Sequence, residues 1–145
     1  MDLNAFQEYF NKHDQFSVRN GIRLTRIQEG YAEAEMDFAP ETCNLMGTMH
    51  GGAYYTLADV AAGSAIIPYG KICVTLGADM HYLRPASGGK ITAYATVRQH
   101  GGRIGVCNVE IRDQAGELLC MGTITMYITS KQIPEDLREN ERRHP

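Results

Sequence analysis

The sequence has no tryptophan, four cysteines and no long uninterrupted apolar run. The cysteines are widely spaced and form no Cys-x-x-Cys pair, which argues against a zinc site or a redox motif and is typical of reduced thiols. Apolar stretches are far too short to cross a bilayer, so we expect no membrane partner. The opening residues MDLNAFQEYF lack the basic start and cleavage site of a secretory signal, and we therefore expect a cytoplasmic protein.

An excess of positive charge is also missing. The formal net charge of -3 at pH 7 provides no general attraction to nucleic acid or to anionic membranes. A chain of 145 residues, 43% hydrophobic and 21% charged, is one soluble domain of ordinary size. We expect this domain to span residues 1–130 and to be followed by a charged tail, residues 131–145.

The most apolar segment of the chain spans residues 53–67 and contains one carboxylate, Asp59. A segment that is apolar on all sides predicts a buried helix, and Pro68 and Gly70 supply its stop signal. Burying a carboxylate costs free energy unless the group is hydrogen-bonded or used. We expect the rest of the chain to be organised around this helix.

The flanking sequence predicts a short amphipathic helix and six strands. The helix lies near residues 2–12, and the strands lie near 21–27, 31–38, 72–82, 91–98, 103–112 and 118–129. A helix that is apolar all round must be covered on several sides, which predicts an α+β fold with one antiparallel sheet curled around it. The last strand is apolar on both faces, so we expect a second subunit to cover the outer one.

Two groups in the central segment are candidates for chemistry. Gly51 and Gly52 follow His50 at the helix start, where unpaired N–H groups and the helix dipole favour an oxyanion or a phosphate. The alternative is that the glycines only make the turn possible. Asp59 has apolar neighbours, as a general base or nucleophile requires, although a lone carboxylate on a helix is more often a buried acid satisfied by nearby donors.

The spacing of these groups constrains any shared mechanism. Gly51 and Asp59 are eight residues apart, which is about 12 Å along a helix. One scissile carbonyl cannot contact both within hydrogen-bond range. If both act on the same bond, the site must lie across a dimer interface.

Other polar residues have weaker claims. Asn44 could orient a carbonyl or a water, although loop asparagines commonly serve turns, and Thr75 could hold a water for Asp59 or simply pack in its strand. Alternation places Thr75 on the more polar face of its strand. The histidines show no ligand spacing, so we assign no metal. Basic residues at strand ends could bind the phosphates of a carrier such as coenzyme A or could be solvated surface: Arg84, Lys90, Arg98 and Arg103.

These residues together resemble a known family. Asn44, Gly47, His50-Gly51-Gly52 and Leu57-Ala58-Asp59, followed by VTLGADMHYLRPA, are similar to the hotdog-fold acyl-CoA thioesterases of the PaaI (phenylacetic acid degradation) type. The resemblance spans about residues 16–129. It implies a sheet wrapped around a long helix, dimers joined edge to edge, and tetramers. It implies no metal and no redox cofactor.

The resemblance also implies roles for individual residues. Asp59 would be the base or nucleophile, and the Gly51 amide would polarise the thioester carbonyl held by the opposite subunit. Asn44 and His50 would position the carbonyl, the water or the leaving group, with Thr75 near the water. We place the substrate-binding rim at Gly52, Arg84, Lys90 and Arg103.

Two other functions occur on the same fold, although a hydratase places its histidine and carboxylate in a different motif. The domain could bind acyl-CoA without cleaving it, or it could be a hydratase, and the acyl group could also be delivered by a carrier protein instead of coenzyme A. The acyl group itself is open, since an aromatic or a medium aliphatic pocket could be lined by Tyr54, Tyr55, Met46, Met49 and Met80.

Overall fold

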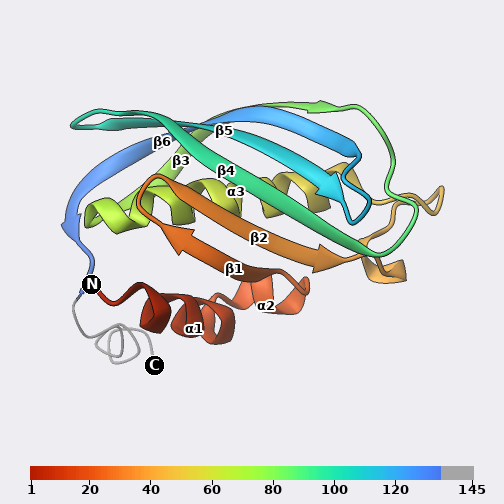
Figure 1. Cartoon of the computed structure of the whole chain (residues 1–145), viewed down its shortest axis with the longest axis horizontal. Coiled ribbons are helices and arrows are strands. Elements are labelled where there is room, and N and C mark those ends of the chain that lie inside the picture. The colour runs from red at the N-terminus through yellow and green to blue at the C-terminus, as the bar shows by residue number, and fades with distance from the viewer. Residues whose placement is uncertain (135–145) are drawn as a thin grey trace.

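One antiparallel sheet of six strands, ordered β1-β2-β4-β5-β6-β3, curves over the long helix α3 (Figure 1). The computed structural model describes residues 1–134. Its strands are β1 (Arg23–Gln28), β2 (Tyr31–Asp37), β3 (Lys71–Tyr82), β4 (Lys90–His100), β5 (Ile104–Asp113) and β6 (Leu118–Gln132). Its helices are α1 (Leu3–His13), α2 (Gln15–Arg19) and α3 (Gly51–Ile66), with short 3-10 turns at Pro40–Thr42 and Ile67–Tyr69. The expected α+β hotdog arrangement is confirmed.

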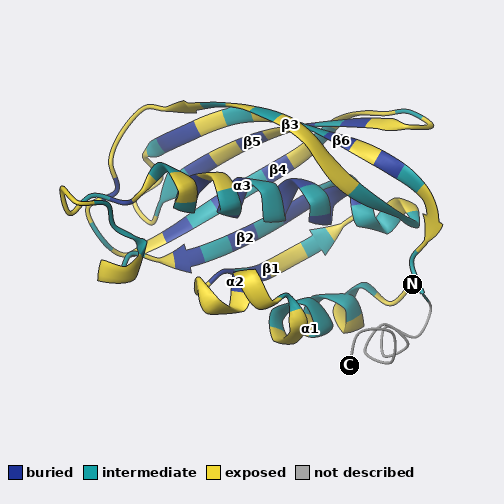
Figure 2. Cartoon of the chain, turned by 180° about the vertical axis from the view of Figure 1, so that it is seen from behind, coloured by how far each residue is buried: buried dark blue, intermediate teal, exposed yellow. Residues whose placement is uncertain are grey.

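Alanine on both sides allows α3 to lie close to the sheet. The face of the helix toward the sheet carries four fully buried alanines: Ala58, Ala61, Ala62 and Ala65. Paired alanines on the strands, Ala32 with Ala95 and Ala34 with Ala93, form the opposing surface. Figure 2 shows these buried stretches of β2 and β4 beneath α3. Because protein interiors are packed to the density of organic crystals, the contact between the helix alanines and the strand alanines fixes the position of α3 on the sheet.

The ends of α3 follow from local sequence signals. His50 is the N-cap, and its side chain accepts a hydrogen bond from the Gly52 amide. After Ile66 the chain tightens into a 3-10 turn that contains Pro68 and ends at Gly70, whose φ of 97° lies in the left-handed region. Glycine adopts that conformation without a steric cost. The helix thus begins two residues earlier than the apolar segment.

The two edges of the sheet differ. At β1, the Asn11 side chain of α1 donates to the Leu24 carbonyl (2.8 Å) and accepts from the Leu24 amide (2.7 Å), so α1 caps this edge. At the other edge, β3 carries Val74 and Leu76, which are 51% and 60% exposed. Long exposed edge strands with apolar side chains are rare in monomers because they invite pairing with another chain.

Two features differ from the sequence-based expectations. Helix α2 has no counterpart among the predicted elements: Asp14 ends α1 and caps α2 by accepting from the Ser17 amide (3.3 Å). The expected domain boundary at residue 130 falls inside β6, which continues to Gln132. Most of the expected charged tail lies outside the described residues.

Candidate active site

Asp59 projects from the middle of α3 toward β3. Its carboxylate accepts a hydrogen bond of 2.5 Å from the Thr75 hydroxyl, and Met126 Sδ lies 3.4 Å from the same hydroxyl oxygen. A hydrogen bond to an ionised acceptor is shorter and stronger than one between neutral groups. Thr75 therefore fixes the orientation of the carboxylate.

A β-bulge places Thr75 there. The register of β3 against β6 shifts between Thr75 and Gly77, so Thr75 lies opposite the buried Met126 while Ala78 lies opposite the buried Ile124. The extra residue in the strand is the exposed Leu76. The expectation that Thr75 belongs to the more polar face was therefore wrong, because a bulge reverses the alternation beyond it.

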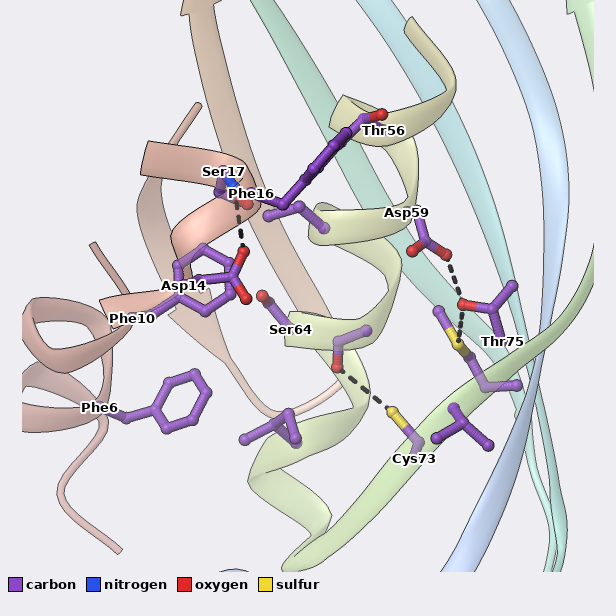
Figure 3. A pocket seen from close by; sticks show the side chains of 15 residues that line it. Phe6, Phe10, Asp14, Phe16, Ser17, Thr56, Asp59, Ser64, Cys73 and Thr75 are labelled. Atoms are coloured by element: carbon purple, nitrogen blue, oxygen red, sulfur yellow. Dashed lines mark hydrogen bonds between the residues drawn. The ribbon is translucent and has the colours of Figure 1, made fainter. Parts of the chain in front are cut away.

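A pocket of about 460 Å³ opens beside Asp59, between α3, β3 and the two N-terminal helices (Figure 3). From α3 and the strands it is lined by Thr56, Asp59, Val60, Gly63, Ser64, Ile67, Cys73, Val74, Thr75 and Met126. From the N-terminal helices it is lined by Phe6, Phe10, Asp14, Phe16 and Ser17. Sequence reasoning missed the second group. The helical spacing of Phe6 and Phe10 revealed an apolar face without revealing what that face covers.

Cys73 is a further side chain in the pocket. Burial raises the pKa of its thiol to about 11, and the neighbouring Asp59 charge acts in the same direction. The thiol lies 3.8 Å from the Gly63 carbonyl, to which it donates. At neutral pH Cys73 is therefore a protonated thiol and a poor nucleophile, because the thiolate is the reactive form. Asp59 is the group in this pocket suited to attack or to proton removal.

The His50-Gly51-Gly52 junction lies at the other end of the same helix. His50 Nδ1 accepts from the Gly52 amide at 2.8 Å, which leaves Nε2 to carry the proton of a neutral imidazole. The Gly52 amide is thus engaged within the chain. Gly51 is the first residue of α3, so its N–H has no intrahelical acceptor and is directed beyond the helix end.

Asn44 shapes the loop before this junction. Its side-chain oxygen accepts from the Met46 and Thr48 amides, and its amide nitrogen donates to the Thr48 hydroxyl. The structure thus places Asn44 within a turn and engages both ends of its side chain there. The same turn exposes Leu45 and Met46 almost completely.

The expected substrate-binding cations are not gathered in one place. Arg84 lines a small pocket with Gly51 and forms an exposed ion pair with Glu117 (3.3 Å). Lys90, at the start of β4, pairs with Glu35 (3.4 Å). Arg103 follows the far end of β4, a strand about 33 Å long. A single chain therefore does not bring Arg103 to Arg84 and Lys90.

Among residues 1–134, no three His, Cys, Asp or Glu side chains are arranged as a metal ligand set would be. No helix in this described part of the chain is both long and apolar enough to span a membrane.

The sheet, the central helix and the helix-borne carboxylate define a hotdog-fold domain, and comparisons with known proteins identify its family. Residues 46–120 match the family model described as thioesterase superfamily. The acyl-coenzyme A thioesterase PaaI of Escherichia coli K12 is 33% identical over 112 residues, which cover 77% of this chain and 79% of that one. The chain belongs to the thioesterase superfamily and resembles its PaaI-type members.

Solved structures agree with this assignment. The structure of the E. coli PaaI protein superposes with a TM-score of 0.82 at 28% identity, covering 90% of this chain and 94% of that one. The thioesterase HI1161 of Haemophilus influenzae gives a TM-score of 0.74 at 26% identity, with coverages of 89% and 91%. The protein is a thioester hydrolase.

Proposed function

We propose that the protein hydrolyses acyl-CoA thioesters, with Asp59 as its reacting carboxylate. The observation that carries the proposal is the short Thr75–Asp59 hydrogen bond in a pocket of about 460 Å³. The name of the E. coli relative, an acyl-coenzyme A thioesterase, supports the choice of substrate. In the overall reaction, a water oxygen bonds to the acyl carbon, the carbon–sulfur bond breaks, and free acid and CoA thiol are released.

Asp59 can serve in either of two ways. As a general base it removes a proton from the water that attacks the carbonyl carbon. As a nucleophile it attacks that carbon itself, releases the CoA thiol, and leaves a mixed anhydride for water to cleave. Both routes require an ionised carboxylate held in one orientation, which is the role of Thr75.

The oxyanion donor comes from a second copy of the chain. Gly51 is the first residue of α3 and Asp59 lies in its middle, about 12 Å farther along the helix axis. One carbonyl therefore cannot contact both groups of one chain. The Gly51 amide of a partner is free to polarise the carbonyl presented to Asp59. The uncovered edge of β3, with exposed Val74 and Leu76, supplies a surface on which such a partner can pair.

The phosphates of CoA are expected near the start of α3. Arg84 lines a pocket together with Gly51. In its ion pair with Glu117, the Arg84 side chain is 65% exposed and the Glu117 side chain is 58% exposed. Exposed ion pairs contribute little stability, so a phosphate can replace the glutamate at small cost. Lys90 can act in the same way. Arg103 can join this site only from another subunit.

The test is release of free thiol from a panel of acyl-CoAs: phenylacetyl, hydroxybenzoyl and medium-chain aliphatic. Wild type is assayed beside Asp59→Asn, which has nearly the same shape and lacks the charge. Asp37→Asn is the matched control, because Asp37 is exposed and lies outside the pocket.

Thiol release by wild type and by Asp37→Asn, with none by a folded Asp59→Asn, is the expected result. Unchanged hydrolysis by Asp59→Asn would remove this carboxylate from the mechanism. Bound acyl-CoA without any thiol release would instead indicate a binding module.

A further inference from the structure

Gly51 brings one open backbone donor to the start of α3. Its amide is directed beyond the helix end, whereas the next amide, that of Gly52, donates to His50 Nδ1 at 2.8 Å. During thioester hydrolysis the carbonyl oxygen becomes an oxyanion, and sites that stabilise such an oxygen commonly direct more than one hydrogen-bond donor at it. A second donor beside Gly51 is therefore expected.

Two polar residues of the preceding loop, Asn44 and His50, are poorly placed to be that donor. Both ends of the Asn44 side chain are engaged within its own turn, where its amide nitrogen donates to the Thr48 hydroxyl at 2.9 Å. His50 lines a different pocket, on the side of the helix start where Thr42 and Cys43 lie. The second donor has to come from another segment of the chain.

Tyr82, the last residue of β3, lies directly beside Gly51. Its ring atoms Cε1 and Cζ are 3.6 and 3.7 Å from the position that a Cβ atom on Gly51 would occupy, and its hydroxyl oxygen is 4.0 Å from that position. The Gly51 nitrogen is about 2.5 Å from the same position, so the hydroxyl and the amide lie within about 6.5 Å of each other. Both residues line a pocket of about 210 Å³.

This separation suits a shared acceptor. Two donors that each lie about 2.7–3.1 Å from one oxygen are at most about 6 Å apart, which is close to the upper limit found for Tyr82 and Gly51. Because glycine has no side chain, the space between the amide and the hydroxyl is open to that oxygen.

A buried neighbour holds the Tyr82 ring. Tyr54 is 3% exposed, and its hydroxyl accepts a hydrogen bond of 2.9 Å from the Ala86 amide. The ring centroids of Tyr54 and Tyr82 are 6.0 Å apart, with an angle of 46° between the planes. Aromatic pairs at this range interact favourably and restrict one another. Tyr82 itself is 50% exposed, so a ligand can approach its hydroxyl.

The hydroxyl of Tyr82 carries its proton at neutral pH. Partial burial raises the pKa of this phenol above its ordinary value of about 10, and Cys120 and Tyr55 act in the same direction. A protonated phenol donates a hydrogen bond and has no charge that would repel an oxyanion.

We propose that Tyr82 is a catalytic residue whose hydroxyl acts with the Gly51 amide as a second hydrogen-bond donor to the thioester oxyanion. The inference rests on the proposed acyl-CoA hydrolysis and adds a residue that contacts the reacting carbonyl. Both donors belong to one chain, and the carbonyl that they bind is presented to Asp59 of a second copy.

The tyrosine takes part without exchanging a proton. As the attacking oxygen bonds to the acyl carbon, the electron pair of the carbonyl π bond moves onto the carbonyl oxygen, and the hydrogen bonds from both donors strengthen. The pair returns when the carbon–sulfur bond breaks and the thiolate leaves. Tyr82 keeps its proton throughout, so its contribution is to the charge of the transition state.

The variant that tests this role is Tyr82→Phe, which removes the hydroxyl and keeps the ring that packs on Tyr54. Tyr94→Phe is the matched control, because Tyr94 lies on the face of β4 opposite the buried Ala93 and Ala95. Wild type and both variants are compared by kcat and KM with the acyl-CoA of the panel that wild type hydrolyses fastest. Their Tm values establish that each is folded.

We expect Tyr82→Phe to lower kcat by at least about tenfold and to keep KM within about threefold of wild type, because the lost bond strengthens in the transition state. Tyr94→Phe should match wild type in both constants.

A spectroscopic readout separates a hydrogen-bond donor from a tyrosine that only packs. Phenylacetyl-CoA labelled with carbon-13 at its carbonyl is bound to folded Asp59→Asn protein, and the infrared band of the thioester carbonyl is recorded. Donors to the carbonyl oxygen move this band to lower wavenumber. Adding Tyr82→Phe to the Asp59→Asn protein should move the band to higher wavenumber, and adding Tyr94→Phe should leave it in place.

Wild-type kcat in Tyr82→Phe would overturn the proposal and leave the hydrolase function intact. A lower kcat with an unmoved carbonyl band would also overturn it, because Tyr82 would then act through the fold. If wild type releases no thiol from any acyl-CoA, the proposed reaction fails, and the infrared comparison still decides whether Tyr82 contacts the carbonyl.

Discussion

Replacing Thr75 with valine removes the hydroxyl that holds Asp59 and keeps the shape of the side chain. The lost interaction is the 2.5 Å bond to a carboxylate, and hydrogen bonds to ionised groups contribute about 1.5–3 kcal/mol. If this bond orients Asp59 in the transition state, kcat/KM falls by about 10-fold to about 150-fold. Thiol release under subsaturating acyl-CoA measures the change directly. The free energy of unfolding should also fall, by less than this amount because Thr75 lies at an exposed position, so activity is compared on folded protein.

Two further variants make this prediction specific. Thr75→Ser keeps the hydroxyl and should stay within a few-fold of wild type. In the Asp59→Asn background, Thr75→Val should lower the free energy of unfolding by less than it does in wild type, because the bond it removes serves Asp59. A folded Thr75→Val enzyme with wild-type kcat/KM would refute the positioning role, as would equal losses of stability in the presence and absence of the Asp59 carboxylate.

Other consequences concern the edge strand and the buried thiol. Leu76→Arg places a charge on the exposed bulge of β3 and should convert the proposed oligomer to monomers, with loss of turnover. Light scattering that still finds the wild-type mass would exclude this edge as the interface. The pKa of Cys73, raised to about 11 by burial, favours the folded thiol, so its stabilisation is complete below about pH 9 and is lost as the pH rises toward 11. The Tm of Cys73→Ala should therefore fall less between pH 8 and pH 10.5 than that of wild type, and parallel decreases would contradict the shifted pKa.

The central helix was predictable because apolar residues on all of its faces indicate that it is buried on every side. Residues 53–67 are apolar all round, and in the structure strands cover one face while the N-terminal helices lie across the pocket from another. The carboxylate at Asp59 was conspicuous for the same reason. The stop at Pro68 and Gly70 came from local chemistry that acts independently of tertiary contacts.

The phase of β3 was not predictable from alternation. A period of two assigns Val74 and Leu76 to the core, yet both are exposed, and a bulge at Leu76 restores Ala78 and Met80 to the inner face. No local residue pattern predicted this bulge. Gly77, the residue that follows it, is also compatible with a regular strand. Thr75 was therefore named as a residue that could act with Asp59 and was still assigned to the wrong face of its strand.

The pocket wall depends on contacts between segments that are distant in sequence. The aromatic spacing of α1 predicted a buried face, but it did not reveal that Asp14 and Ser17 would lie across from Ser64. One local signal was present. Asp14 precedes Ser17 by three residues, which is the spacing between an N-cap residue and the backbone amide that donates to its side chain. It would have predicted α2. The separation of Arg103 from Arg84 likewise required the strand pairing.

A shared site makes a prediction that no single-chain site can reproduce. Gly51→Pro removes the proposed oxyanion donor with little strain, because proline is favoured at the first helical position and His50 already has the extended backbone that a following proline requires. Asp59→Asn and Gly51→Pro should each be inactive as homodimers. In a heterodimer, one site joins both altered residues while the other joins an intact Asp59 to an intact Gly51. Random exchange of equal amounts makes about half of the dimers mixed, so the mixture should regain about a quarter of wild-type activity. If the two residues acted within one chain, every site would contain a defect and mixing would restore nothing.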